Sequence, residues 1–279
     1  MRAPGPSPLP ALARWRNTAF AAAVVALALT GWSMAAWATG TALLALSGAG
    51  HLAFHRDRTR RTRDAAPRLV TAPVRGRWRA LNGPAGKVPS HGTHACAQTY
   101  AIDVVHEPED GGERPGFAWW PLARRPEAFP AYGTAVLAPA DGTVAVVHDG
   151  ARDHLSRTSW PALLLLFAEG LVRSVAGVNR LLGNHVVLDL GDGTYALAAH
   201  LRRGSLAVVP GQAVRAGELL ARCGNSGNSS EPHVHFQLMT GPRCRHAHGL
   251  PFRWRHRAGG EDRTGVPGND TLFTPLADG

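Results

Sequence analysis

The sequence predicts a mainly β protein with an antiparallel β-sheet or sandwich-like domain, one helical insertion, and one or more membrane helices before it. Strand-like apolar runs alternate with turn formers in a chain that contains 32 Gly and 21 Pro. Residues 161–182 instead carry apolar side chains at helical spacing. Residues 18–54 contain no Asp, Glu, Lys or Arg. These three observations are the basis of the predicted fold class.

The charge-free run of residues 18–54 exceeds the roughly 20 residues that a membrane helix needs. It predicts either one transmembrane helix with an apolar remainder, or two that turn near residues 31–40. Arginines on both sides of the run, at positions 14–16 and 56–63, favour a hairpin with both ends in the cytoplasm. A third interpretation is a signal peptide with Ala36-Trp37-Ala38 as its cleavage site. We therefore expect a short basic N-terminus, residues 1–17, and attachment to the cell membrane through residues 18–54.

The formal net charge of +10 favours anionic partners such as cell-wall polymers or lipid headgroups, although an arginine-rich codon habit explains it equally well. No DNA- or RNA-binding motif accompanies the charge, so no nucleic-acid partner is expected. The three cysteines do not form a CxxC pair. Cys223 and Cys244 are able to form a disulfide in an exported protein, leaving Cys96 free, and three reduced thiols are the alternative.

After the membrane segment, the pattern predicts a basic linker at residues 55–89, a folded domain at 90–256 and a C-terminal tail at 257–279. Within the domain we expect strands at residues 99–105, 135–147, 185–190, 195–201 and 233–239. Asp-Gly and Pro-Gly pairs between these runs are typical of turns. The helical segment at residues 161–182 interrupts the strands as an insertion, packed against the domain or against a membrane surface.

Three segments of this domain carry side chains suited to metal chemistry. Asp103 lies in an otherwise apolar strand, where a carboxylate is costly to bury unless it is paired or bound to a metal. His200 ends a second apolar strand. His233 and His235 stand at i and i+2 of a third, so both imidazoles project from one face of the sheet. Taken singly, each histidine is most often a packing residue. Together with Asp103, they predict a zinc site with neighbouring proton-transfer groups.

Several motifs in fixed order resemble the lysostaphin-type (LytM-type) zinc metallopeptidases, which are peptidoglycan endopeptidases. The resemblance covers roughly residues 90–252 and is interrupted by the segment 161–182. The motifs are APADGTV at 138–144, GNHVVL at 183–188, YALAAHL at 195–201, VVPGQAVRAGE at 208–218, GNSG at 224–227 and PHVHF at 232–236. QTYAID at 98–103 resembles a branch of the family with a lengthened gap between the first histidine and the aspartate.

The resemblance implies one zinc ion per chain, with Asp103 and His235 as ligands. The first ligand is expected to be His94, with His91 as the alternative, because the usual short spacing before the aspartate is absent and Gly92 makes that loop pliable. By the same resemblance His200 and His233 are catalytic residues that do not bind the metal. They would take a proton from water or stabilise the tetrahedral oxyanion.

The expected function is that of a membrane-tethered zinc endopeptidase that hydrolyses peptide bonds in bacterial peptidoglycan, with its catalytic domain outside the cytoplasm. The site outweighs the charge pattern that favours a cytoplasmic domain, because long domains can translocate despite basic flanks. The alternative is a catalytically inactive domain of the same fold that binds the wall or activates an amidase. A third possibility is a lysin-like module for another substrate. Because the chain keeps a full set of candidate ligands, the enzyme is the favoured interpretation.

Overall fold

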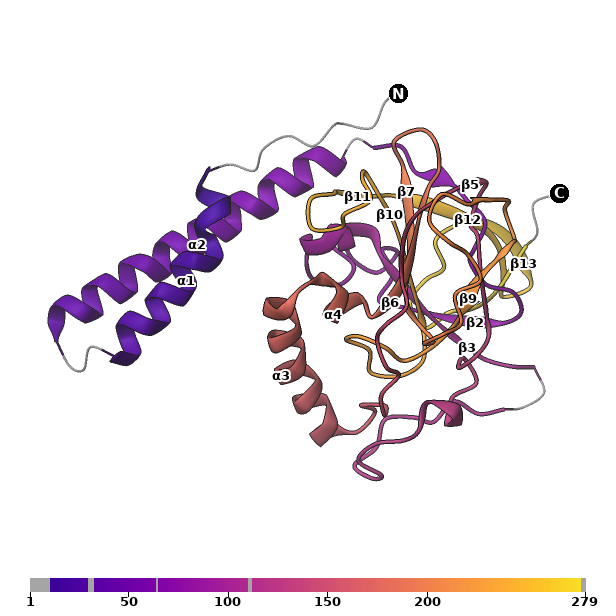
Figure 1. The fold of residues 1–279 in the computed structure, drawn as a ribbon, viewed down its shortest axis with the longest axis horizontal. Helices are drawn as coiled ribbons and strands as arrows, with labels where there is room; N and C mark the ends of the chain where they lie inside the picture. Colours follow the sequence, from indigo (N-terminus) through magenta and orange to yellow (C-terminus); the bar gives the residue numbers. More distant parts are fainter. Residues whose placement is uncertain (1–10, 30–32, 64, 110–111, 277–279) are drawn as a thin grey trace. The chain divides into compact units, whose positions relative to one another are not determined.

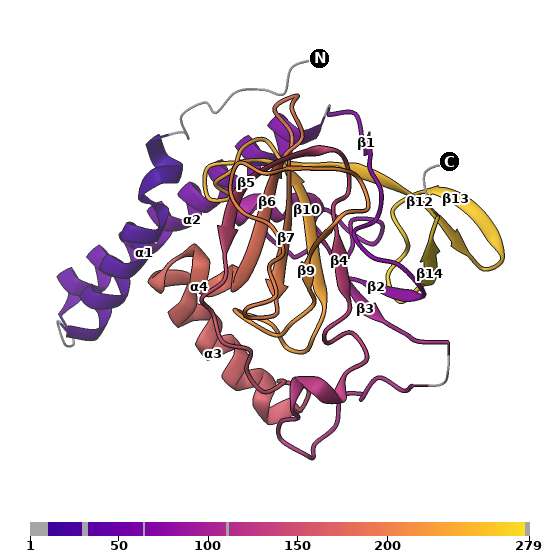
Figure 2. The same ribbon diagram turned by 45° about the vertical axis from the view of Figure 1, so that its right-hand side comes forward.

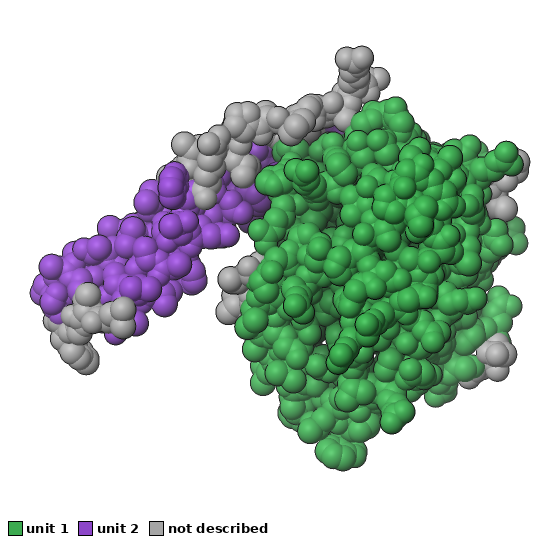
Figure 3. Space-filling view, in the orientation of Figure 1, with its two compact units in different colours: residues 1–4, 66–279 green, residues 5–65 purple. Residues whose placement is uncertain are grey.

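The computed structural model describes residues 11–29, 33–63, 65–109 and 112–276. Contacts divide these residues into two compact units, one within residues 5–65 and the other within residues 66–279 (Figure 3). The first unit contains two helices, α1 (Ala11–Leu29) and α2 (Met34–Arg63). The second contains every strand and all of the predicted site residues.

The prediction of membrane helices in residues 18–54 is wrong. Among the residues that the structure describes, no helix is both long enough and apolar enough to cross a membrane. The charge-free run is divided between α1 and α2, and residues 30–32 lie outside the described residues. Small and polar residues such as Gly40, Thr41 and Ser47 dilute the apolar side chains of α2. For predicting a membrane helix, a run without charged residues is therefore a weaker criterion than a run of strongly apolar residues.

The second unit is built around one twelve-stranded sheet, in the order β1-β12-β14-β2-β3-β10-β7-β6-β5-β8, with β11 added beside β10 and β13 beside β12 (Figures 1 and 2). A separate two-stranded sheet joins β4 and β9. The strands are β1 (Arg68–Leu69), β2 (Trp78–Leu81), β3 (Ile102–His106), β4 (Ala135–Leu137), β5 (Gly142–His148), β6 (Asn184–Asp189), β7 (Tyr195–Leu201), β8 (Ala213–Val214), β9 (Leu219–Arg222), β10 (Val234–Met239), β11 (Gly249–Leu250), β12 (Phe252–Ala258), β13 (Glu261–Gly265) and β14 (Leu272–Pro275).

The sheet is mixed, which corrects the predicted antiparallel architecture. Strand β1 runs parallel to β12, with Arg68 opposite Phe252 and Leu69 opposite Arg253. The other pairings among the described strands are antiparallel. Apolar and polar alternation identifies a strand but carries no information on the direction of its neighbour, and β1 is only two residues long.

The sheet also extends beyond the segment expected to form the folded domain. Strands β1 and β2 lie within residues 55–89, which had the composition of a linker, and β13 and β14 lie within residues 257–279. In the sheet order, β14 separates β12 from β2. Strands from the beginning and from the end of this unit are therefore neighbours in one sheet.

The centre of the sheet is buried on both faces. In β10 all six residues are buried, so the side chains of both faces are covered. One face presents Phe236, whose ring packs against Phe252 and Trp254 with centroids 5.1 and 5.5 Å apart. Trp254 in turn stacks on Phe273 of β14. This aromatic cluster holds β10 from one side, while His235 and Gln237 project from the other.

Helices α3 (Trp160–Ala176) and α4 (Val178–Leu182) occupy the segment in which a helical insertion was expected. Ser159 caps α3 by accepting a hydrogen bond from the backbone N–H of Ala162. Gly177, with φ of 122°, separates the two helices. Figures 1 and 2 show both helices to one side of the sheet, with α4 leading directly into β6.

Candidate metal centre

Three adjacent strands bring the predicted site residues together. Strand β10 pairs with β3 so that His235 lies opposite Asp103, and with β7 so that His235 lies opposite Ala199. His200 follows Ala199 near the end of β7. His233 directly precedes β10, two residues from His235. The order β3-β10-β7 thus gathers residues that are about 30 to 130 positions apart in the sequence.

Asp103 is the centre of this cluster. Its Oδ1 lies 2.9 Å from Nδ1 of His235 and 3.6 Å from Nε2 of His233. Its Oδ2 lies 3.0 Å from Nε2 of His91 and accepts a hydrogen bond of 3.0 Å from the side-chain amide of Asn82. The ligand atoms of His91, Asp103 and His235 all lie within 4.8 Å of one another. Of the described residues, these three form a group that is able to hold a metal ion.

The structure brings His91, rather than His94, to Asp103. His94 is buried, and its Nδ1 lies 2.9 Å from the hydroxyl of Thr99. Two hydrogen bonds of Ser90 explain why His91, and not His94, lies at Asp103. The backbone N–H of Ser90 donates to the carbonyl of Thr99, and its hydroxyl donates to the carbonyl of Gln98. These bonds fold the loop back along the residues that precede β3. His91 is thereby placed over the carboxylate, while His94 packs inside the loop.

Burial and histidine neighbours oppose each other in setting the pKa of Asp103. Burial by itself would raise the pKa, but the nearby His91 and His233 and the hydrogen bonds from His235 and His91 hold it well below the ordinary value. The pKa of His235 is raised, because the hydrogen bond and charge of Asp103 outweigh the effect of its burial. Asp103 is therefore ionised at neutral pH and supplies a negative charge that favours a cation.

The donor set and its orientation fit zinc. Nε2 of His235 lies 3.1 Å from Oε1 of Gln237, and the Gln237 amide nitrogen donates to the carbonyl of Cys96. When a metal replaces the proton between His235 and Asp103, this anchored oxygen keeps the remaining ring proton on Nε2, so that Nδ1 is free to be the ligand atom. Tetrahedral zinc with bonds of about 2.0–2.2 Å places its ligand atoms roughly 3.3 Å apart. The separations of 2.9 and 3.0 Å at Asp103 are close to that value.

His200 lies beside the cluster in a strained backbone conformation. Its φ of 62° is rare for a residue with a side chain, and such strain persists where the surrounding structure imposes it. Nδ1 of His200 lies 2.9 Å from the carbonyl of Ser226, so it carries the proton of the neutral ring. Burial, reinforced by His233 and His235, holds the pKa of His200 well below its ordinary value. The ring is therefore neutral at pH 7, with Nε2 as the atom able to accept a proton.

His233 is oriented in the same way. Its Nδ1 lies 2.8 Å from the carbonyl of Glu231, which directs Nε2 toward Asp103. The Glu231 carboxylate is held in turn by two hydrogen bonds from the guanidinium of Arg114. The rings of His200 and His233 lie with their centroids 4.8 Å apart. Two buried imidazoles thus stand next to the three candidate ligands.

Two residues of the site were not singled out from the sequence. Gln237 stands two residues after His235, so strand alternation places both on the same face, and this signal was present in the sequence. Asn82, which donates to Asp103, lies in the segment predicted to be a linker. Its φ of 49° belongs to the left-handed region that asparagine tolerates. Its sequence context contains no pattern that indicates a role at the site.

Part of the chain matches a known protein family. Residues 166–247 match the model of peptidase family M23, and the matched segment contains His200, His233 and His235. This part of the chain belongs to peptidase family M23. The resemblance to lysostaphin-type peptidases seen in the motifs is thereby confirmed. His91 and Asp103 precede the matched segment.

Solved structures of M23 proteins are similar to the chain at low sequence identity. A catalytic-domain mutant of the prophage-encoded M23 protein EnpA from Enterococcus faecalis is 19% identical, with 54% of this chain and 73% of that chain covered and a TM-score of 0.32. The catalytic domain of the antimicrobial peptidase lysostaphin from Staphylococcus simulans is 16% identical, with 67% and 90% covered and a TM-score of 0.31. In a longer lysostaphin structure the match covers only 41% of that chain.

Proposed function

We propose that this chain is a zinc-dependent endopeptidase that hydrolyses peptide bonds in bacterial cell-wall peptidoglycan. The observation that carries the proposal is the group of His91, Asp103 and His235, whose ligand atoms lie within 4.8 Å of one another. Two imidazoles and one carboxylate leave a coordination position open, as in catalytic zinc sites. Membership of the matched segment in peptidase family M23 supports the reaction and the substrate class.

The proposed zinc ligands are His91, Asp103 and His235, so that His91 takes the place given to His94 on sequence grounds. Support comes from the 3.0 Å separation between His91 Nε2 and Asp103 Oδ2. The hydrogen bond of His94 to Thr99, within its own loop, is consistent with a role in loop packing. Gln237 holds His235 in the tautomer that presents Nδ1 as the ligand atom.

Zinc at this site supplies Lewis-acid activation of the peptide carbonyl and of a water molecule. His200 is proposed to accept a proton at Nε2, since its lowered pKa keeps the ring neutral and its Nδ1 is committed to Ser226. His233, fixed through the carbonyl of Glu231, presents Nε2 beside Asp103 and is proposed to stabilise the oxyanion once Nε2 has taken up a proton and can donate it in a hydrogen bond. Neither histidine is proposed as a ligand.

The proposed substrate places the active domain outside the cytoplasm, where peptidoglycan lies. The formal net charge of +10 supports attraction to anionic polymers of the wall as well as to peptides with free carboxylates.

Digestion of purified peptidoglycan by the full-length chain tests the proposal. With zinc supplied, new amino groups should appear without new reducing sugar ends, because peptide bonds and not glycan bonds are broken. Elemental analysis should find about one zinc per chain, as a single three-ligand site requires. Asp103→Ala should lose both the metal and the release of amino groups.

The matched control is Asp262→Ala, which removes an exposed carboxylate on β13 and should change neither result. A wild-type chain that takes up no zinc and releases no amino groups, yet sediments with peptidoglycan, would refute the enzyme and support the wall-binding alternative.

A further inference from the structure

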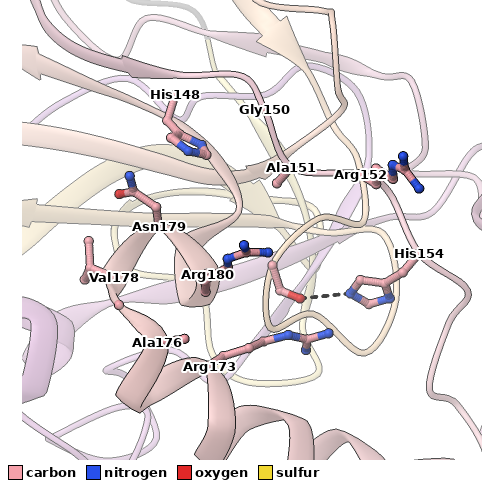
Figure 4. A pocket seen from close by; sticks show the side chains of 12 residues that line it. His148, Gly150, Ala151, Arg152, His154, Arg173, Ala176, Val178, Asn179 and Arg180 are labelled. Atoms are coloured by element: carbon pink, nitrogen blue, oxygen red, sulfur yellow. Dashed lines mark hydrogen bonds between the residues drawn. The ribbon is translucent and has the colours of Figure 1, made fainter.

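A cavity of about 910 Å³ lies beside the catalytic residues and has a strongly basic wall. Helices α3 and α4 form one side, the loop that follows β5 forms another, and Gly227 closes it. Arg152, Arg173 and Arg180 line the cavity together with His148 and His154. Figure 4 shows Arg173 and Arg180 reaching from the helices toward the loop that carries Arg152 and His154. We call this cavity the arginine pocket.

The charges of the arginine pocket are only partly neutralised. Arg173 forms an ion pair of 3.1 Å with Glu169, but Glu169 also accepts hydrogen bonds from Arg157 outside the pocket. Within the described part of the chain, Arg152 and Arg180 have no acidic partner, and both are exposed. Guanidinium groups are suited to carboxylates and phosphates, which they bind with two parallel hydrogen bonds.

The two aspartates of the loop after β5 do not line the arginine pocket, and in the described part of the chain they form no ion pair with its arginines. Asp149 accepts a hydrogen bond of 2.7 Å from the backbone N–H of Gly204. Asp153 accepts one of 2.7 Å from the backbone N–H of Asn225. Both carboxylates thus fasten the loop to neighbouring backbone, and the pocket keeps an excess of positive charge.

One short loop connects the arginine pocket to the catalytic histidines. The carbonyl of Gly227 accepts a hydrogen bond of 2.9 Å from His154 at the pocket wall (Figure 4). The carbonyl of the preceding residue, Ser226, accepts from His200 at 2.9 Å. On the helix side, Asn228 donates to the carbonyl of Leu181 at 2.8 Å. Residues 226–228 therefore contact both the wall of the arginine pocket and His200.

We propose that the arginine pocket binds a free carboxylate of the peptide substrate and so selects acidic peptides. This inference rests on the proposed function, which supplies a peptide at the neighbouring metal centre. It assigns a role to α3 and α4, since they contribute Arg173 and Arg180. The position beside His200 favours a peptide carboxylate over a phosphate of a separate wall polymer.

Binding of labelled muropeptides to the full-length chain tests this proposal. The peptides are released from purified peptidoglycan with a muramidase and used in two forms, with free carboxylates or with carboxylates converted to amides. Fluorescence anisotropy on zinc-depleted protein measures binding without hydrolysis. The free-acid form should bind about tenfold more tightly, since hydrogen bonds to charged groups are among the stronger ones. This difference should shrink as salt is raised.

The double variant Arg152→Gln/Arg180→Gln should bind both forms equally. Its control is Arg253→Gln/Arg255→Gln, which removes the same charge from two exposed positions on β12 and should keep the tenfold preference. Since all four positions are exposed, the variants should remain folded, and circular dichroism checks this. Equal affinity of the wild type for both peptide forms would overturn the proposal. So would tighter binding of poly(glycerol phosphate), with displacement of the peptide, which would assign the pocket to a wall polymer.

Steady-state hydrolysis separates the two proposals. A wild-type chain that cleaves free-acid and amidated peptidoglycan with equal KM would uphold the endopeptidase and overturn the carboxylate pocket. Preferential binding of the free-acid form, abolished in the pocket variant but without any cleavage by zinc-loaded protein, would overturn the endopeptidase and uphold carboxylate binding at the arginine pocket.

Discussion

Replacing His91 and His94 one at a time with alanine decides which of them binds the metal. In the structure, His91 Nε2 lies 3.0 Å from the carboxylate of Asp103, whereas His94 Nδ1 lies 2.9 Å from the hydroxyl of Thr99. The two histidines are three positions apart and belong to one loop. Each variant therefore serves as the control for the other.

The two substitutions should differ in how much they change zinc affinity and the free energy of unfolding. Loss of a residue that only orients a ligand costs 10- to 100-fold in metal affinity, so loss of the ligand His91 should cost more than about 100-fold, or roughly 2.7 kcal/mol. His94→Ala removes a buried ring, 3% exposed, and leaves the Thr99 hydroxyl without that partner. It should lower the free energy of unfolding by about 1–3 kcal/mol and change zinc affinity by less than tenfold.

Competition with a chromophoric chelator measures zinc affinity, and urea unfolding of the zinc-depleted chains measures stability. His91→Ala should weaken the metal site far more than His94→Ala does, because only His91 lies at the carboxylate of Asp103. A His94→Ala chain that loses zinc while His91→Ala retains it would refute the geometric reasoning and restore His94 as the ligand.

Four further predictions follow from other parts of the structure. His200→Ala should keep zinc and lose at least about 100-fold in turnover; loss of the metal would make His200 a ligand. Gly227→Ala should destabilise the chain by more than about 1 kcal/mol in urea unfolding, because its φ is 76° and a Cβ atom would lie 2.4 Å from backbone; unchanged stability would contradict this contact. Burial, the largest cause, lowers the pKa of the His185 imidazole in the folded chain. The unfolded chain therefore binds a proton at this histidine more readily, and stability falls as the pH drops below about 6.5. His185→Gln should reduce this loss of stability relative to wild type, as measured by the urea midpoints at pH 5 and pH 7.5. Mild oxidation should join Cys96 to Cys244, whose side chains contact each other, and leave Cys223 reduced in peptide mapping under non-reducing conditions.

Much of the central sheet was predictable because its strands have strong local signals. The run at residues 195–201 coincides with β7, and the pair His233 and His235 shares a face as the period of a strand requires. Burial of Phe236 on the opposite face also follows from this alternation. These features depend only on residues that are neighbours in the sequence, so they can be predicted from one sequence.

Other features depend on contacts between distant segments and were not predictable. The position of His91, rather than His94, beside Asp103 depends on hydrogen bonds from Ser90 to the carbonyls of Gln98 and Thr99, which loop composition does not reveal. The same holds for the cysteines, since the sequence allowed either a pair between Cys223 and Cys244 or three reduced thiols and did not reveal that Cys244 contacts Cys96. Strand β1 is too short to carry an alternation pattern.

The position of β14 has a consequence for how the protein is made. This strand follows the other described strands in the sequence, yet it lies between β12 and β2 and pairs with both. Strand β2 therefore gains its second neighbour only after residues 272–275 have been synthesised. Until residue 275 has left the ribosome, the growing chain presents an open strand edge to its surroundings. Open edges invite pairing with other chains. Translation that stops near residue 256, at the predicted end of the domain, would therefore release a protein in which β2 pairs with β3 alone and exposes its other edge.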